Sequence, residues 1–183
     1  LVLIKQKGAS IMKLFPISIL TLLFSIIFVG CGGDSLIKNG EIALANANYE
    51  EAVKCFKKAT KKNPSAAPLF YNLGTAAARA GDTTEAIAAF REVLRFTPGD
   101  AEAMESLAAV LRDEGSIDSL KESHELLSQV VELTDISPIE KSRALTSLAL
   151  TELAFHRSDL ALAHLLTAKA ITPDYAPAVY NLA

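Results

Sequence analysis

The side chains that could carry out chemistry are few, and their spacing fits no catalytic or metal-binding pattern. The three histidines are His124, His156 and His164. A predicted turn lies between His156 and His164, so they do not share the i, i+4 face that a helical metal pair requires. The sequence has no glycine-rich phosphate loop, no Gly-x-Ser-x-Gly motif and no cysteine–histidine pair at catalytic spacing. We interpret the histidines as exposed polar positions, and we expect no intrinsic catalysis, no metal and no cofactor.

Two further features could be mistaken for functional sites. Cys55 lies inside a predicted helix beside Phe56, where a small, partly buried hydrophobic side chain is expected rather than a reactive thiol. The lysine-rich run from Lys57 to Asn63 could be a basic patch. It occupies the last turns of the same helix, where cations complement the negative end of the dipole. We therefore interpret this run as a solvated face.

Composition favours helices as the elements that position the remaining side chains. Half of the 183 residues are hydrophobic, tryptophan is absent, and good helix formers dominate after residue 34. The formal net charge is −3, which argues against a nucleic-acid partner because that partner requires a basic surface.

The sequence repeats itself at a spacing of 34 residues. Gly40 and Gly74 are 74 − 40 = 34 apart, and the same spacing separates Ala52 from Ala86, Phe56 from Phe90, and Pro64 from Pro98. This period is typical of a helix–turn–helix repeat. Small residues such as Gly74 let the two helices of a pair approach closely, and Phe90 is expected to fill the space beside them. Each pair exposes apolar surface on both sides, so it needs neighbouring pairs to cover it.

These residues resemble the tetratricopeptide repeat family. The resemblance implies an all-α fold, a right-handed α-solenoid of antiparallel helix pairs, over residues 31–183. The expected repeats are about 33–66, 67–100, 101–138 and 139–175. The third repeat closes at Pro138, so either its inter-helix loop or its second helix should be longer than usual. The segment "YNLG" that begins at Tyr71 recurs as "YNLA" from Tyr180. This recurrence suggests a truncated fifth repeat from 176 and a native chain that continues.

In the tetratricopeptide family the first helices of successive repeats line a concave groove that holds a peptide or a partner's helix. By position, the resemblance assigns the following residues to this groove: Lys38, Glu41, Tyr71, Asn72, Thr75, Arg79, Glu102, Glu105, Arg112, Arg143 and Ser147. Tyr71, Asn72 and Arg79 form a plausible recognition trio, although Tyr71 and Asn72 could also belong only to the repeat consensus. Glu102 and Ser106 stand where relatives that clamp a terminal carboxylate carry cations, so that ligand is not expected.

The first thirty residues are a different kind of sequence. Lys13 is followed by sixteen uncharged residues, Leu14 to Val29, and then by small residues around Cys31. This pattern predicts a secretory signal over 1–30, with translation starting at Met12. This signal could be that of a lipoprotein, and the alternatives are a plain cleaved signal and an uncleaved membrane helix. Sixteen helical residues rise only about 24 Å, which is short of a ~30 Å hydrocarbon core.

The residues from Phe28 to Cys31 resemble the lipobox of bacterial lipoproteins, in which the cysteine becomes the lipidated N-terminus. Phe28 departs from the usual leucine. Gly32 is not the aspartate that retains such proteins in the inner membrane, so the resemblance implies the outer membrane of a bacterial envelope. Removal of residues 1–30 takes away three lysines and no acids, which changes the net charge from −3 to −6. Cys55 would then be the only free thiol, so no internal disulfide is expected.

Two functions are compatible with this sequence. The first is a lipid-anchored envelope adaptor that binds other proteins through the helical groove without chemistry of its own. The second is the targeting or regulatory arm of an enzyme whose catalytic domain lies beyond Ala183. A small-molecule-binding solenoid is disfavoured because the groove lacks a predicted aromatic cage.

Overall fold

The computed structural model describes residues 34–182, and this part of the chain contains helices and turns but no strand. The residues from Leu36 onward form one compact unit. The predicted signal segment 1–30 and the lipidation site at Cys31 lie outside the described residues. The all-helical fold expected from composition is confirmed for residues 34–182.

The helices alternate with short turns. Residues 34–45 are helical and precede the labelled elements. The others are α2 (Tyr49–Lys62), α3 (Ala67–Ala80), α4 (Thr83–Phe96), α5 (Ala101–Glu114), α6 (Ile117–Glu132), α7 (Pro138–Ala154), α8 (Ser158–Ile171) and α9 (Ala176–Tyr180). Local sequence sets their starts, because a capping side chain accepts a hydrogen bond from a backbone N–H of the first turn. Asp82 does so before α4, Asp100 before α5, and Ser137 forms a complete capping box with Glu140 before α7.

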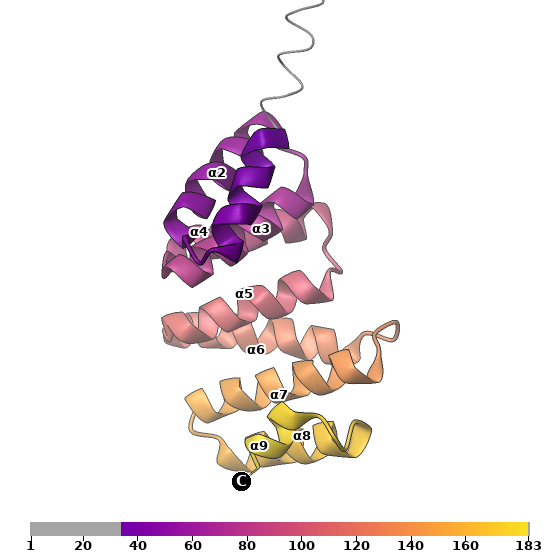
Figure 1. The fold of residues 1–183 in the computed structure, drawn as a ribbon. Coiled ribbons are helices and arrows are strands. Elements are labelled where there is room, and N and C mark those ends of the chain that lie inside the picture. The colour runs from indigo at the N-terminus through magenta and orange to yellow at the C-terminus, as the bar shows by residue number, and fades with distance from the viewer. Residues whose placement is uncertain (1–33, 183) are drawn as a thin grey trace, which may run out of the picture. The chain divides into compact units, whose positions relative to one another are not determined.

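The helices are stacked in chain order, as Figure 1 shows from α3 to α8. Each helix packs mainly against the helices before and after it. The first helices of consecutive pairs also contact one another, α3 with α5, α5 with α7 and α7 with α9. Between α2 and α9, the second helices α4, α6 and α8 make no contacts of similar extent with each other. The first helices therefore form the inner side of the stack.

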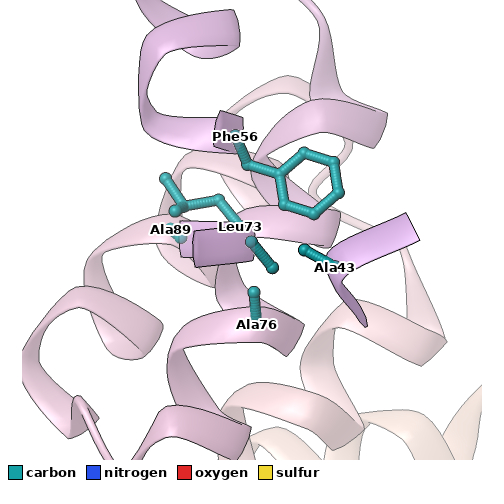
Figure 2. Packing of buried hydrophobic residues seen from close by; sticks show 6 residues of the cluster. Ala43, Phe56, Leu73, Ala76 and Ala89 are labelled. Carbon is teal, nitrogen blue, oxygen red and sulfur yellow. The ribbon is translucent and has the colours of Figure 1, made fainter. Parts of the chain in front are cut away.

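A glycine and a phenylalanine join the two helices of each of the first two pairs. In the first pair, a Cβ on Gly40 would lie 2.8 Å from the ring of Phe56. In the second, a Cβ on Gly74 would lie 2.8 Å from the ring of Phe90. The close approach expected from the 34-residue spacing is thus confirmed. Figure 2 shows Phe56 packed with Ala43, Leu73, Ala76 and Ala89, a cluster that joins the first pair to the second.

Each turn inside a pair contains one residue with a positive φ, seven positions after the small residue of the first helix. These residues are Ala47, Gly81, Gly115 and His156, with φ between 55° and 79°. Glycine adopts this conformation without penalty, whereas a residue with a Cβ loses about 1–2 kcal/mol there. The second and third turns therefore have glycine at the position with positive φ, whereas the first and fourth have a residue with a Cβ there.

We expect His156→Gly to raise the free energy of unfolding by about 0.5–1 kcal/mol. The exposed His156 has a φ of 60°, and the relief of this strain exceeds the entropy that a glycine adds to the unfolded chain. Gly81→Ala is the reciprocal control at φ 79°, and it should lower the stability by about 1 kcal/mol. Urea titrations followed by circular dichroism measure both. A loss of stability in His156→Gly would contradict this account of the turn.

The later repeats are longer than the earlier ones, and the third does not close where we expected. Pro138 is the first residue of α7. Proline suits this position because the backbone N–H that it lacks would have no partner inside the helix. The boundary therefore lies one residue earlier than predicted. The turn between α5 and α6 is short, while α6 has 16 residues where α4 has 14. Of the two alternatives for the extra residues, the second helix is the one that lengthens.

Candidate functional site

The inner side of the stack carries a hydrogen-bonded network that begins at Tyr71 on α3. The Tyr71 hydroxyl donates to Glu102 Oε1 on α5 at 2.9 Å and lies 3.3 Å from Ser106 Oγ. The Tyr71 ring meets Phe90 edge-on with a centroid distance of 5.6 Å, and Phe90 is itself held against Gly74. Burial, together with the neighbouring carboxylates, raises the pKa of Tyr71. The tyrosine is therefore a fixed, neutral hydrogen-bond donor on this surface.

A second link joins α5 to α7. The guanidinium of Arg143 donates from Nε to Glu105 Oε2 at 2.6 Å and from a terminal nitrogen to Oε1 at 3.2 Å. The Glu105 side chain is only 9% exposed, so this two-point pairing compensates the charge of a nearly buried carboxylate. Its hydrogen bonds to Glu105 raise the pKa of Arg143. The charges of Glu105 and Arg143 therefore neutralise each other.

Two adjoining cavities run along this inner side and share Tyr71 and Glu102. The first, the Tyr71 pocket, has a volume of about 350 Å³ and is lined by Ala67, Pro68, Tyr71, Asn72, Val93, Thr97, Asp100 and Glu102. The second, the Arg143 pocket, has a volume of about 310 Å³ and is lined by Tyr71, Glu102, Glu105, Ser106, Ala109, Arg143 and Ser147. The two cavities adjoin at Tyr71 and Glu102, and we refer to them together as the groove; their lining includes residues of α3, α5 and α7.

The structure brings six of the residues assigned to the groove into these two pockets: Tyr71, Asn72, Glu102, Glu105, Arg143 and Ser147. It does not bring Arg79 to Tyr71. The guanidinium carbon of Arg79 lies 5.9 Å from the centroid of the Tyr49 ring on α2. Eight residues along a helix correspond to about 12 Å, so the two ends of the expected trio face different neighbours.

The remaining assigned residues also lie outside the two pockets. Arg112 is 3.6 Å from Asp113 on its own helix, and Thr75 is half-buried. Lys38 and Glu41 are exposed on the helix of residues 34–45. The two pockets therefore contain six of the eleven assigned residues, and the assignment of Lys38, Glu41, Thr75, Arg79 and Arg112 to the groove stays a prediction.

Sequence reasoning missed the part of the Tyr71 pocket that comes from the segment between α4 and α5. Thr97 and Asp100 lie in this segment and line the pocket. The sequence marks it only as a helix stop at Pro98 and a helix start at Asp100. The available signal was the 34-residue period itself, because it places the end of one second helix beside the start of the next first helix.

His156 is exposed, as expected, but His124 and His164 are half-buried, and for these two the interpretation as exposed polar positions is corrected. His124 on α6 lies with Nε2 2.9 Å from Glu152 Oε1 on α7, and the Glu152 residue is 1% exposed. Arg157 contacts the other carboxylate oxygen at 3.3 Å. His164 on α8 is half-buried, and desolvation lowers its pKa although Glu152 acts in the opposite direction. The buried Glu152 is thus contacted by basic side chains from α6 and from the turn before α8. Such partners are needed because a buried charge without them is costly.

Cys55 is a buried side chain of α2, 6% exposed. Burial is the main cause that raises the pKa of its thiol, and Glu51 acts in the same direction. A thiol with a raised pKa is a poor nucleophile, so the interpretation of Cys55 as a small hydrophobic residue is confirmed. Among residues 34–182, no group of three potential ligands is placed to hold a metal ion. No helix in that range is both long and apolar enough to cross a membrane.

Comparison with known proteins supports the fold. A family profile described as tetratricopeptide repeat matches residues 37–101. MamA from Desulfovibrio magneticus RS-1 superposes with a TM-score of 0.70 and 20% identity, covering 82% of this chain and 81% of the other. YrrB, described as a TPR protein with an unusual peptide-binding site, gives 0.71 and 23% over 81% and 73% of the two chains. PilF of Pseudomonas aeruginosa gives 0.65 and 19% over 84% and 70%.

A curated relative is much longer than this chain. The tetratricopeptide repeat and J domain-containing co-chaperone DNJ1 of Cryptococcus neoformans is 29% identical over 111 residues. This match covers 61% of the present chain and 21% of the relative, so the chain spans about a fifth of that protein. Since the solved structures are less than 25% identical, they establish the fold alone. The described residues have the fold of tetratricopeptide repeat proteins, as the resemblance implied.

Proposed function

We propose that this protein is a lipid-anchored adaptor of a bacterial cell envelope, and that it binds extended segments of other proteins in the groove formed by the Tyr71 and Arg143 pockets. The observation that carries the binding role is the pair of adjoining cavities lined by residues of α3, α5 and α7. Tyr71 and Glu105 are already held by neighbouring helices. A preorganised surface loses little side-chain entropy when a ligand binds. The proposal includes no chemistry by the chain itself.

The chemistry of the groove suits an extended peptide backbone. The Asn72 side chain offers one acceptor and two donors, and Ser147 offers a hydroxyl on α7. Both residues line the groove, and neither side chain has a hydrogen bond to another described residue. They remain available to the amide groups of a ligand. The neighbour YrrB is described as having a peptide-binding site, which supports the same class of ligand here.

A photo-crosslinking experiment tests the binding role. Benzoylphenylalanine is introduced at Asn72 or Ser147 in the groove, and at the exposed Lys58 or Glu125 on second helices as controls. Irradiation of cells should give discrete protein adducts from the two groove positions and none above background from the controls. Equal adducts from both surfaces, or adducts from the controls alone, would contradict a binding role of the groove.

The anchoring part of the proposal depends on Cys31, which follows an apolar run and a glycine, Gly30. Acyl chains on this cysteine would give firm anchoring, since each buried methylene contributes about 0.8 kcal/mol. We expect Cys31→Ala to abolish incorporation of radiolabelled palmitate and to release the protein from the membrane fraction. Cys55→Ala is the matched control and should remain labelled. Palmitate on the Cys31→Ala protein would refute a lipidated Cys31.

A further inference from the structure

The Tyr71 pocket has an excess of negative charge that no side chain of the described residues compensates. Asp100 and Glu102 both line it, and neither belongs to an ion pair within residues 34–182. The adjoining pocket is lined by the cation Arg143, and both of its hydrogen bonds go to Glu105. The pocket therefore presents two carboxylates to whatever enters it.

The hydrogen-bonding groups of the pocket are also mostly acceptors. The Tyr71 hydroxyl uses its proton on Glu102, and the Thr97 hydroxyl uses its proton on the carbonyl of Val93 at 3.0 Å. Asp100 accepts from the backbone N–H of Ala103 at 2.9 Å. One oxygen of each carboxylate remains free, and among the side chains that line the pocket Asn72 alone still offers donors. A ligand that fits must therefore bring several donors of its own.

The helix that begins beside the pocket does not reverse this charge. The N-terminus of α5 contributes about half a positive charge from its unpaired N–H groups. Asp100 caps this end and Glu102 lies in the first turn, so the partial charge is already opposed by two full negative charges. An anionic ligand would have to approach both carboxylates, which is unfavourable.

The walls of the pocket suit the stem of a long basic side chain. Ala67, Pro68 and Val93 supply apolar surface, and the ring of Tyr71 supplies an aromatic surface that attracts cations. Lysine and arginine place methylene groups on such surfaces while the charged end reaches polar groups. A guanidinium has five donors in a fixed plane, which matches several acceptors better than an ammonium does.

The geometry points to a cationic side chain, arginine in preference to lysine, of an extended peptide as the ligand of the Tyr71 pocket. This inference rests on the proposed peptide-binding function of the groove and specifies the class of partner: a segment with a basic residue at the position that reaches Asp100 and Glu102. Glutamate or aspartate at that position is selected against by the same two carboxylates.

The test uses the full chain and two defined peptides, acetyl-Ala-Ala-Arg-Ala-Ala-amide and the same peptide with citrulline, the neutral isostere of arginine. Binding is measured by heteronuclear NMR at low and high salt. The arginine peptide should shift the resonances of Asn72 and Asp100 and bind about fivefold to tenfold more tightly than the citrulline peptide, a preference that salt weakens. Glu102→Gln should reduce the preference to less than about twofold.

Two further variants serve as controls for the effect of Glu102→Gln on the peptide preference. Glu125→Gln removes the same charge from the exposed side of α6 and should leave the preference unchanged. Asp100→Asn keeps a capping oxygen before α5 and should reduce the preference as Glu102→Gln does. Equal binding of both peptides would overturn the cationic class while leaving a peptide-binding groove. Failure of both peptides to bind would also overturn it, and the crosslinks from Asn72 would then decide the proposed function separately.

Discussion

Substitution of Gly74 by tryptophan should lower the free energy of unfolding by about 3 kcal/mol or more, since overpacking a filled core forces neighbours out of place. The cause is specific to the second helix pair. A Cβ at residue 74 would already lie 2.8–2.9 Å from three atoms of the Phe90 ring. Phe90 is 2% exposed and is also in contact with Tyr71, so its ring has no free space to enter. Thermal and urea unfolding, followed by circular dichroism, measure the loss.

Gly99→Trp is the matched control, because a Cβ at Gly99 would have nothing within 4 Å. It should change the stability by less than about 1 kcal/mol. A double variant, Gly74→Ala with Phe90→Leu, should be more stable than the sum of the two single changes predicts, since the smaller side chain releases the contact. A melting temperature unaltered in Gly74→Trp would show that the helices of the second pair do not meet as described.

Removal of both basic partners of Glu152 should destabilise the protein far more than removal of Glu152 itself. In His124→Ala with Arg157→Ala, a carboxylate that is 1% exposed loses its contacts with both basic side chains. Breaking a buried pair in this way costs about 3–5 kcal/mol. Glu152→Leu leaves His124 and Arg157, whose side chains are 35% and 50% exposed. Both can turn to water, so this change should cost less than about 1.5 kcal/mol.

The triple variant that combines His124→Ala, Arg157→Ala and Glu152→Leu is the control for this difference. It should recover most of the stability that the double alanine variant loses, because no uncompensated carboxylate remains. Denaturant unfolding of the four proteins gives the coupling energy directly. If Glu152→Leu proves as destabilising as the double alanine variant, the carboxylate stabilises the fold through contacts other than these two.

The helix pairs could be predicted from the sequence because one spacing repeats at several kinds of residue. Gly40 and Phe56 return as Gly74 and Phe90, and each phenylalanine ring requires a glycine opposite it because a Cβ there would collide with the ring. This pairing can be read directly from the sequence because it recurs at the same spacing. The inner positions of Tyr71, Glu102 and Arg143 follow from the same spacing, since each lies on the first helix of its pair.

The contacts of Glu152 could not be predicted in this way. Its partners come from α6 and from the turn before α8, and no periodic signal marks an acid that will be buried. The contact that Arg79 makes could not be predicted either, for a different reason. It shares a helix with Tyr71, but a distance of about 12 Å along the axis puts it beside Tyr49. Position within a repeat therefore predicts the side of the stack more reliably than it predicts which side chains meet.

The buried thiol on α2 has a practical consequence for measurements on the intact protein. In a Cys31→Ala background Cys55 is the sole cysteine, and it is enclosed beside Phe56 in the first pair. An alkylating reagent can reach its sulfur only after this pair separates from its neighbours. The rate of alkylation under native conditions therefore reports how often the first helix pair of the described stack opens.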